Sequence, residues 1–564
     1  MIENNFKINR LNLNETVNLY GWINKIRKMG DIIFLDLRGS NGIVQIVLEK
    51  NHLDYEKVLN FKNNDIISIS GKVFERKNKN KNIFSGDIEI IANKINLISA
   101  VSNQLPILPF EEITALEQVR MRYRYLDLRR PNIFNIFKIR SEFNKYTRRF
   151  FDENNFLEIE TPYLTKRTYG GASELIVTSK NHLGKEYALA QSPQIYKQLL
   201  MYSGFERYYQ IARCFRDEDS RSDRQLEFTQ LDLEMSFIND KEIEEKIYLL
   251  IELYFEFILK NVFKKEILLP FKRITYKYAL ENYGSDKPDL RYENKIFDLI
   301  KNNLIKLKDK KIAKGIAFEK NISISQIKKI KKDFKDNSIN FSYFFVKDGI
   351  YSEGEIKEEF KKDINKFNNF LNLSNYFVIF LISEDKNKLL NTLGEIRIKV
   401  AKKLNLANKD KLKFCWITDF PLFDKDKENN LVSSHNPFVA LKDESDLEKI
   451  NLKKENELLN LMSRSYDLVL NGYEIAGGSI RIRDKEIQRK IFKILKLTNE
   501  EIDRNFDWLL TAQSFATPYH GGIALGIDRI LAILLKKSSI KEVIAFPKTS
   551  QGTDELSGAP SEKN

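Results

Sequence analysis

The chain has 564 residues, of which 42% are hydrophobic, and carries a formal net charge of +14. This length exceeds what one hydrophobic core usually supports, so we expect about two to four domains. Because no run of about 18 apolar residues occurs and the N-terminus lacks a signal-peptide core, we expect a cytoplasmic protein that does not span a membrane. The two cysteines and four histidines lack metal-ligand spacing, so no zinc is expected.

Residues 1–103 show the pattern of a small β-barrel. Five short apolar stretches separated by turn residues are predicted strands: Val17–Ile23, Ile32–Arg38, Gly42–Val47, Asp65–Val73 and Ile88–Ile91. Five strands in about a hundred residues favour a closed barrel of the OB type, a fold that binds oligonucleotides.

Basic side chains of this predicted barrel lie near an aromatic residue. Lys25 and Arg27 precede Phe34 and Gln45 on neighbouring predicted strands. Cations beside an aromatic ring are the groups that bind phosphates and stack bases of single-stranded nucleic acid. The alternative is a basic barrel surface with a core phenylalanine, and the pattern alone does not decide between the two.

The rest of the chain divides by pattern into a connector and a strand–helix region with an insertion. Residues 104–130 form a proline-bearing connector, and residues 131–284 alternate helix and strand, beginning with an amphipathic helix at Asn135–Asn154. Residues 285–405 are rich in lysine and carry no pattern of catalytic residues, which predicts an inserted α/β domain. Residues 406–564 resume the alternation of strand and helix.

A predicted hairpin carries polar residues where a plain core strand would not. Tyr208–Phe215 and Glu227–Met235 alternate as strands on either side of a loop that begins at Arg216. Four residues of the second strand share one face: Phe228, Gln230, Asp232 and Glu234. Carboxylates and an amide on such a face are costly to bury unless they bind something. A solvated hairpin is the alternative reading of this segment taken alone.

The hairpin and several other segments together resemble the bacterial-type aspartyl-tRNA synthetases of class IIb. The shared segments are GWINKIRKMGDIIFLDLRGSNGIVQIV, MRYRYLDLRRP, AQSPQIYKQLLMYSGFERYYQIARCFRDED, EFTQLDLE, NGYEIAGGSIRIRD, GGIALGIDR and IAFPKT. The resemblance extends over nearly the whole chain and is weakest in the insertion. It implies an α+β multidomain protein with an OB-fold barrel and a class II antiparallel catalytic sheet. It also implies a homodimer that uses ATP to charge tRNA(Asp) with L-aspartate.

The resemblance implies that Arg216 and Arg529 are the catalytic residues. Attack of a carboxylate on the α-phosphate needs positioning and charge neutralisation rather than a protein nucleophile. Arginine suits this role because its planar fork holds phosphate by two parallel hydrogen bonds. The other implied ATP contacts are Asp217, Glu218, Gln225, Glu474, Gly526, Ile527 and Asp528. Gly521, Gly522 and Gly526 would let the backbone approach the nucleotide.

Two carboxylates are implied ligands of the Mg²⁺ that accompanies ATP. Asp467 and Glu474 are seven residues apart, about two helical turns, so a helix would place both on one face. Magnesium in nucleotide sites often takes one or two carboxylates together with phosphate oxygens. The alternative is a solvated helix face, which the otherwise apolar segment disfavours.

The resemblance implies that Lys197 and Arg481 bind the side-chain carboxylate of aspartate. Asparagine would leave these cations unpaired in a desolvated site, a loss of roughly 3–5 kcal/mol. The other implied aspartate-binding residues are Ser192, Gln194, Ile195, Tyr196, Arg216, Gln230, Asp232 and His435. The chain departs from the family at Gly170, where a glutamate that would meet the substrate ammonium is usual, and we expect Glu174 or a water to replace it. Asn436 stands where a second histidine is usual.

The barrel is implied to read the anticodon of tRNA. Phe34 would stack on a base, Gln45 would read a base edge, and Lys25 and Arg27 would contact phosphates. Met29 lies in the loop that in this family separates strict enzymes from those that also charge tRNA(Asn). It is apolar, which favours the strict form.

Two other functions compete with this interpretation. The first is a class IIb synthetase specific for asparagine or lysine, which Lys197 and Arg481 oppose because neither substrate offers a side-chain anion. The second is a non-catalytic tRNA-binding paralogue. The candidate ATP-site residues oppose it: Arg216, Glu218, Asp467, Glu474 and Arg529. A free-standing amide-forming paralogue would lack the barrel.

Overall fold

The computed structural model describes residues 12–39, 42–80, 85–109, 115–167, 173–218, 222–307, 311–320, 322–449 and 454–562. The chain forms two compact units. The first comprises Met1–Phe137, Ala545–Thr549 and Thr553–Asn564, and the second comprises Lys138–Ile544 and Ser550–Gly552. Among the described residues, no helix is both long and apolar enough to cross a membrane.

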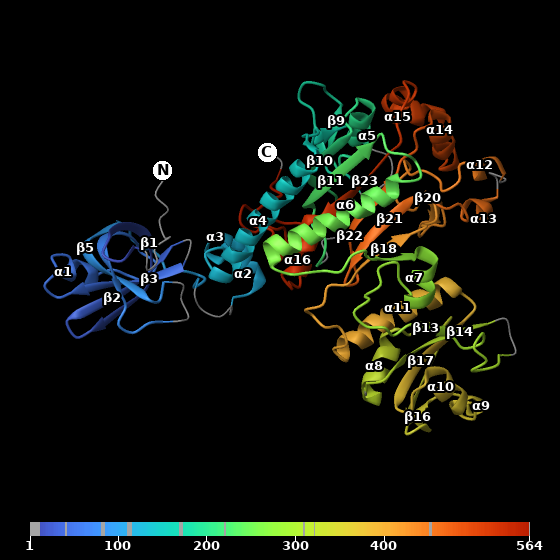
Figure 1. The fold of residues 1–564 in the computed structure, drawn as a ribbon, viewed down its shortest axis with the longest axis horizontal. Helices are drawn as coiled ribbons and strands as arrows, with labels where there is room; N and C mark the ends of the chain where they lie inside the picture. The colour runs from blue at the N-terminus through green and yellow to red at the C-terminus, as the bar shows by residue number, and fades with distance from the viewer. Residues whose placement is uncertain are drawn as a thin grey trace. The chain divides into compact units, whose positions relative to one another are not determined.

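The first unit contains the predicted five-stranded barrel (Figure 1). Its strands are β1 (Thr16–Met29), β2 (Ile32–Gly39), β3 (Gly42–Glu49), β4 (Ile66–Glu75) and β5 (Ile88–Ser99). They close in the order β1-β2-β3-β5-β4, with the short helix α1 (Tyr55–Leu59) between β3 and β4. Alternate apolar residues fill the interior because successive side chains of a strand point to opposite faces. The predicted OB-type barrel is therefore confirmed.

The connector becomes helical in its second half. It forms α2 (Glu117–Arg122) and α3 (Arg124–Asp127), and α4 (Pro131–Glu153) follows. Helix α4 begins at Pro131, four residues before the predicted start, because proline is well suited to the first turn of a helix. The connector is held to the barrel by Trp22, whose ring lies 5.2 Å from the Arg38 guanidinium and 4.9 Å from that of Arg129.

The second unit is built on an eight-stranded sheet in the order β12-β18-β21-β22-β23-β11-β10-β6. The strands are β6 (Leu157–Glu158), β10 (Arg207–Phe215), β11 (Glu227–Ser236), β12 (Lys272–Thr275), β18 (Phe414–Thr418), β21 (Ser465–Leu470), β22 (Tyr473–Ile480) and β23 (His520–Gly526). All neighbours are antiparallel except β12 with β18 and β6 with β10. The predicted antiparallel catalytic sheet is confirmed, and it brings the hairpin β10–β11 beside strands from the end of the chain.

Helices flank this sheet, and α6 crosses it in Figure 1. The longer ones are α5 (Gln194–Tyr202), α6 (Ile243–Ile258), α7 (Tyr276–Tyr283), α14 (Lys485–Ile494), α15 (Asn499–Gln513) and α16 (Ile527–Leu534). The shorter elements are β7 (Leu164–Thr165), β8 (Ile176–Thr178), β9 (Glu186–Leu189), β19 (Phe423–Lys425), β20 (Leu431–Ser433), α12 (Asp446–Lys449) and α13 (Glu455–Leu458). A π-turn at Leu259–Phe263 and a 3-10 turn at Ile540–Val543 complete the unit outside the insertion.

The predicted insertion contains a sheet of its own, in the order β13-β14-β17-β15-β16. Its strands are β13 (Ile296–Asp298), β14 (Ile312–Phe318), β15 (Asn340–Lys347), β16 (Ile350–Glu355) and β17 (Tyr376–Ser383). Its helices are α8 (Ile324–Asp333), α9 (Glu358–Lys361), α10 (Ile364–Leu371) and α11 (Lys386–Lys403). Every residue of β17 is buried because separate apolar clusters cover the two faces of the sheet. The domain boundaries predicted from sequence stay predictions.

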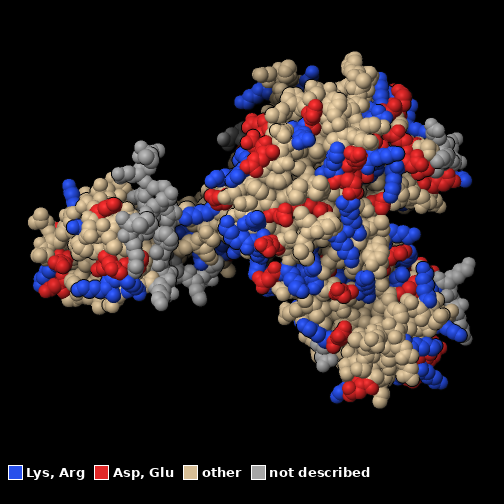
Figure 2. Space-filling model, viewed as in Figure 1, with Lys and Arg blue, Asp and Glu red and all other residues tan. Residues whose placement is uncertain are grey.

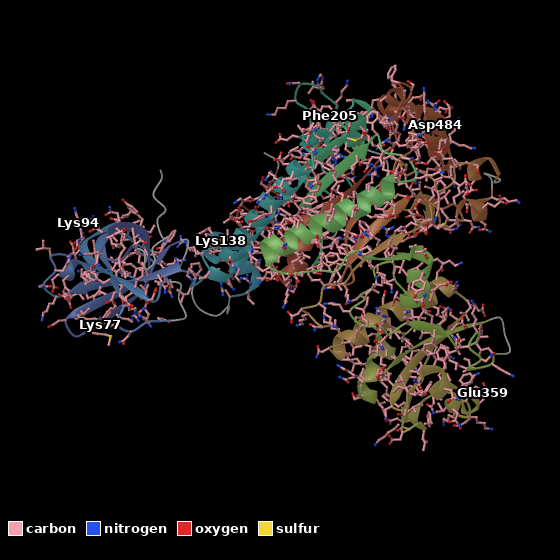
Figure 3. The ribbon with its side chains drawn as sticks, viewed as in Figure 1. Lys77, Lys94, Lys138, Phe205, Glu359 and Asp484 are labelled. Carbon is pink, nitrogen blue, oxygen red and sulfur yellow. The ribbon has the colours of Figure 1, made fainter. Side chains whose placement is uncertain are left out.

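Charged side chains are spread over the surface of both units. On the face shown in Figure 2, lysine and arginine are interleaved with aspartate and glutamate. On the barrel, Lys77 and Lys94 are exposed examples (Figure 3). Function therefore has to be inferred from charged residues at particular positions rather than from the net charge of +14.

Candidate active site

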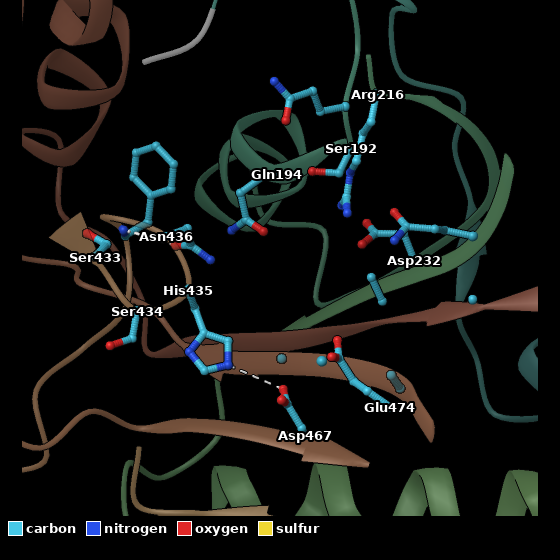
Figure 4. A pocket seen from close by; sticks show the side chains of 18 of the residues that line it. Ser192, Gln194, Arg216, Asp232, Ser433, Ser434, His435, Asn436, Asp467 and Glu474 are labelled. Carbon is cyan, nitrogen blue, oxygen red and sulfur yellow. Dashed lines mark hydrogen bonds and ion pairs between the residues drawn. The ribbon is translucent and has the colours of Figure 1, made fainter. Parts of the chain in front are cut away.

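A cavity of about 1200 Å³ lies in the second unit and gathers most of the predicted site residues. Those that line it are Ser192, Gln194, Ile195, Tyr196, Lys197, Arg216, Glu218, Gln225, Gln230, Asp232, His435, Asp467, Glu474, Arg481, Gly526, Asp528 and Arg529. Figure 4 shows several of them around one shared space. Of the predicted residues that the structure describes in this unit, Asp217, Gly521, Gly522 and Ile527 do not line the cavity.

The hairpin β10–β11 forms part of the cavity wall. In its register Gln210 faces Asp232, Ala212 faces Gln230 and Cys214 faces Phe228. Arg216 follows β10, and its guanidinium lies over the Phe228 ring, 5.1 Å from the centroid. Its buried Nε has no hydrogen-bond partner among the described residues. The aromatic ring thus holds a cation whose hydrogen-bonding capacity is left for an anion in the cavity.

Two buried cations and two buried carboxylates form a quartet at the base of the cavity. Lys197 Nζ lies 2.6 Å from Asp232 Oδ1 and 3.2 Å from Glu234 Oε2. Arg481 donates from Nε to Glu234 Oε1 (2.8 Å) and from Nη2 to Glu234 Oε2 (3.1 Å). All four residues are at most 4% exposed. Paired carboxylates are what permit two cations to stay buried here.

The two carboxylates of the quartet differ in their environment. Burial raises the pKa of Asp232, although Lys197 opposes the shift. Burial also acts to raise the pKa of Glu234, but Arg481 and Lys197 outweigh it and lower that pKa. Asp232 Oδ2 has no hydrogen-bond partner within the described part of the chain, whereas both oxygens of Glu234 are bonded. Asp232 therefore keeps one acceptor for a cationic group.

The start of α5 supplies further walls of the cavity. Gln194 Nε2 is buried without a partner in the described chain, and the Gln230 amide oxygen accepts from Cys214 Sγ at 3.1 Å. Ile195 packs into an apolar cluster, and the Tyr196 ring lies 5.5 Å from Trp508. Ile195 and Tyr196 thus shape the cavity, whereas the glutamines offer polar groups to it.

At the other end of the cavity, candidate nucleotide-binding side chains contact residues of the loop after β10. Arg529 donates from Nη1 to the Glu474 carbonyl oxygen (2.6 Å) and forms an ion pair with Asp223 (3.2 Å). Glu218 pairs with Arg224 at 2.5 Å. These charged contacts place an arginine and a glutamate where a nucleotide bound in the cavity would meet them.

The side chain of Asp528 is used in hydrogen bonds to neighbouring elements. Its carboxylate accepts from Arg140 Nη1 (2.5 Å) and from the Thr229 backbone N–H (2.7 Å), and it is buried. This ties α4 and β11 to the start of α16, one residue before Arg529. The predicted ATP contact of Asp528 remains a prediction, and the structure gives its side chain a positioning role.

The structure gives a reason for glycine at position 522 that the sequence did not predict. A Cβ there would lie 2.0 Å from Glu234 Oε2, so glycine is needed for the quartet to form. A Cβ on Gly526 would meet no atom closer than 3.8 Å. Of Gly521, Gly522 and Gly526, only Gly526 has room for a Cβ without a close contact.

The prediction that a helix presents Asp467 and Glu474 was wrong. They lie on β21 and β22, which form a hairpin turning at Asn471 and Gly472, with φ of 54° and 88°. Both carboxylates nevertheless face one spot, because a Cβ on Gly477 would lie 3.0 Å from Asp467 Oδ1 and 3.7 Å from Glu474 Oε1. A hairpin with a bulge therefore brings the two carboxylates together, as two helical turns were expected to do.

Charged neighbours surround this carboxylate pair. His435 Nε2 lies 3.3 Å from Asp467 Oδ1 (Figure 4), and Lys287 Nζ lies 2.8 Å from Glu474 Oε2. Burial and the charge of Glu474 raise the pKa of Asp467. Burial acts to raise the pKa of Glu474, but Lys287 and Arg529 outweigh it and lower that pKa. Burial acts to lower the pKa of His435, and Asp467 outweighs it in the opposite direction.

These two carboxylates fit a magnesium ion that arrives with a nucleotide. Magnesium prefers oxygen ligands and keeps several waters, so it needs only one or two carboxylates beside phosphate. No group of three or more histidine, cysteine or acidic side chains suited to a metal occurs among the described residues. Asp467 and Glu474 supply one carboxylate each, which fits the need of such an ion.

Glu174 lines the cavity and forms an ion pair with Arg167 at 3.3 Å. Gly170, where the sequence departs from the family pattern, lies outside the described residues. Asn436 accepts from the Phe438 backbone N–H at 3.0 Å, which stabilises its loop. The substitution expected of Glu174 stays a prediction.

On the barrel, three of the four predicted contacts come together. Arg27 pairs with Phe34 across the strands, and its Nη2 contacts Asp36 (2.6 Å) and Gln45 Oε1 (3.3 Å). Gln45 Nε2 donates to Glu89 Oε2 (2.8 Å), so both ends of this buried amide are bonded. Phe34 is partly exposed and Lys25 is exposed. A base that stacks on Phe34 would meet Arg27 nearby, but Gln45 would have to exchange a bond to read it.

Comparisons with known proteins identify this architecture. The family described as tRNA synthetases class II (D, K and N) matches residues 116–550. The chain belongs to this family. An OB-fold nucleic acid binding domain matches residues 17–98, the barrel of this synthetase.

Relatives of this synthetase match along almost its whole length. An aspartate–tRNA ligase of Mycoplasma mycoides is 42% identical over 560 residues, covering 97% of this chain and 95% of the relative. An aspartate–tRNA(Asp/Asn) ligase of Dictyoglomus turgidum is 43% identical over 584 residues, covering 99% and 95%. A crystal structure of asparaginyl-tRNA synthetase from Pyrococcus horikoshii matches with a TM-score of 0.60 at 19% identity, covering 97% of this chain and 99% of that one. The last likeness bears on the fold alone.

Sequence reasoning missed several residues of the synthetase site. Glu234 shared the predicted polar face of β11, and its alternation was the available signal, but its role depends on Arg481, 247 residues later. Asp223 and Lys287 lie in segments whose sequence shows no pattern that indicates a role for these two residues. The Asn471–Gly472 pair was an available signal for the hairpin, because Asn-Gly favours two-residue turns with positive φ.

Proposed function

We propose that this synthetase activates L-aspartate with ATP to aspartyl-adenylate and transfers the aspartyl group to the 3′ end of tRNA(Asp). One observation carries the choice of aspartate. Lys197 and Arg481 line the cavity, whereas Glu234, which holds both cations in place, is not among the lining residues. Lysine and arginine have donors only, so the cavity offers N–H groups to a carboxylate.

The remaining polar groups fit the rest of the substrate. Asp232 Oδ2 is the uncommitted acceptor and suits the substrate ammonium. Arg216 would hold the α-carboxylate and the α-phosphate, and Arg529 the γ-phosphate end of ATP, so that negative charge is neutralised as pyrophosphate leaves. The positioned carboxylate attacks phosphorus directly, and no protein nucleophile is required. Asp467 and Glu474 would hold Mg²⁺, which neutralises phosphate charge when bound.

ATP–pyrophosphate exchange tests this proposal. The expected result is exchange that depends on aspartate and is lower with asparagine, because the asparagine amide brings an N–H₂ donor to a place where Lys197 and Arg481 also present only donors. Exchange driven by asparagine or lysine would reassign the substrate. Absence of exchange with all three amino acids would favour the non-catalytic paralogue.

We also propose that the barrel binds the anticodon of tRNA(Asp), with Phe34 stacked on a base, and that the protein acts as a cytoplasmic homodimer. The partly exposed Phe34 beside Arg27 supports the first point. Met29, the exposed last residue of β1, is apolar, which favours strict charging of tRNA(Asp). Charging purified tRNA(Asp) and tRNA(Asn) side by side tests strictness, and sedimentation of the purified protein tests the dimer.

A further inference from the structure

Lys287 is a cation of the cavity without a role in the proposed reaction. Lys287 belongs to the predicted insertion, just after α7, and lines the cavity. Its Nζ lies 2.8 Å from Glu474 Oε2 and 3.9 Å from Asp286 Oδ2. The side chain is 41% exposed, so the ammonium group can move without leaving a buried charge behind.

The backbone that carries Lys287 is fixed by close packing against α11 of the insertion. Helix α7 ends at Gly284, which has φ of +64° and whose Cβ would lie 2.2 Å from the Leu390 carbonyl oxygen. A Cβ on Gly394 of α11 would in turn lie 2.1 Å from the Gly284 carbonyl oxygen. Two glycines therefore let the end of α7 touch the middle of α11 directly.

Arg397 of α11 clamps the continuation of the same loop. Its guanidinium donates to the carbonyl oxygens of Asn294 (2.6 Å), Tyr292 (2.9 Å) and Asp289 (3.0 Å). It is buried, with the Tyr292 ring 4.1 Å away. Hydrogen bonds to a charged group are stronger than neutral ones, so the loop is held firmly to α11.

The loop also contacts the hairpin that bears the two carboxylates. Gly472 at the turn of β21–β22 has φ of +88°, and a Cβ there would lie 3.1 Å from Asp289 Cβ. The loop thus lies between α11 and the catalytic hairpin, and Lys287 projects from it onto Glu474.

We propose that Lys287 binds the β- and γ-phosphates of ATP and that Arg397 is its positioning residue, so that the insertion contributes a cation to the nucleotide site. The inference rests on the proposed ATP site. Lys287 contacts Oε2 of Glu474, whereas Oε1 lies on the side of Asp467, so a magnesium ion between the two carboxylates would leave the Lys287 ammonium beside it. ATP bound with that ion would bring phosphate oxygens into the cavity that Lys287 lines, where its partly exposed ammonium group would contact them. Before ATP binds, the ammonium group neutralises Glu474.

Equilibrium binding of ATP and of AMP to the full-length protein, measured by calorimetry with Mg²⁺ and without aspartate, tests this role. In Lys287→Gln we expect ATP binding to weaken about tenfold or more, as loss of one charge-assisted contact predicts. AMP binding should stay within about twofold, because AMP lacks the β- and γ-phosphates. Equal losses for both nucleotides, or no loss for ATP, would overturn the inference.

Lys386→Gln is the matched control. Lys386 pairs with Glu281 at 2.9 Å across the same α7–α11 junction but does not line the cavity. We expect wild-type binding of both nucleotides. A wild-type protein that binds no ATP would sink the proposed function itself, whereas ATP binding by wild type and Lys287→Gln alike would sink only the role of Lys287.

Arg397→Lys tests the positioning role. Lysine keeps the charge but cannot donate to three carbonyl groups in one plane, so a folded variant should show the same selective loss of ATP affinity. Wild-type ATP affinity in a folded Arg397→Lys protein would remove Arg397 from the proposal. The Lys287 side chain is 41% exposed, so its substitution should disturb folding little, and Lys287→Gln decides the main point whatever the stability of Arg397→Lys.

Discussion

Replacing Glu234 with glutamine tests whether the buried quartet is what holds the aspartate pocket together. The carboxylate contacts Arg481 through both oxygens and Lys197 through one, and all three side chains are buried. The amide keeps the shape but removes the negative charge and turns an N–H₂ group towards a cation. Breaking a buried ion pair from one side costs about 3–5 kcal/mol, a large part of a domain's total stability of about 5–15 kcal/mol.

Denaturant unfolding measures this loss, and the same strand offers a matched control. Glu227 on β11 pairs with Arg213 at 2.6 Å, but these side chains are 29% and 39% exposed. Solvent screens such a pair, so Glu227→Gln should cost about 1 kcal/mol or less. Aspartate-dependent exchange should fall on the order of 100-fold in Glu234→Gln, because displaced cations misplace the substrate. Equal stability of the two variants would refute the reasoning.

Three further predictions follow from particular contacts. Burial lowers the pKa of His520 to about 4 from 6.5. The unfolded chain therefore binds the proton more readily than the folded protein. The free energy of unfolding should keep its full value above pH 6.5 and fall by roughly 3 kcal/mol as the pH drops towards 4. Urea unfolding at several pH values should show a smaller slope in His520→Gln, and an equal slope would contradict the assignment. Phe34→Ala should weaken tRNA charging on the order of 10- to 100-fold through lost stacking while ATP–pyrophosphate exchange stays nearly intact; loss of both would indicate a folding defect. Gly522→Ala should lower the melting temperature because its Cβ would meet Glu234 Oε2, whereas Gly526→Ala has space and should melt like wild type; similar melting of both would show that the quartet does not need the glycine.

Much of the site was predictable because its signals are local. Alternation along 227–235 predicted β11 and its polar face, and the regular spacing of apolar strands predicted the barrel. The helix expected around Asp467 failed because a separation of seven residues suits two helical turns and also the two arms of a tight hairpin. The Asn471–Gly472 turn residues distinguish the two and favour the hairpin.

The strands, the motif-bearing segments and most cavity residues could be predicted from the sequence, because periodicity and turn chemistry depend on a few neighbouring residues. Which charged side chains form ion pairs became known from the fold. Glu234 holds Arg481 across the sheet order β22-β23-β11, and Lys287 reaches Glu474 because two glycines bring α7 against α11. Such pairings depend on packing between segments up to hundreds of residues apart, and buried charges must find partners wherever the fold places them.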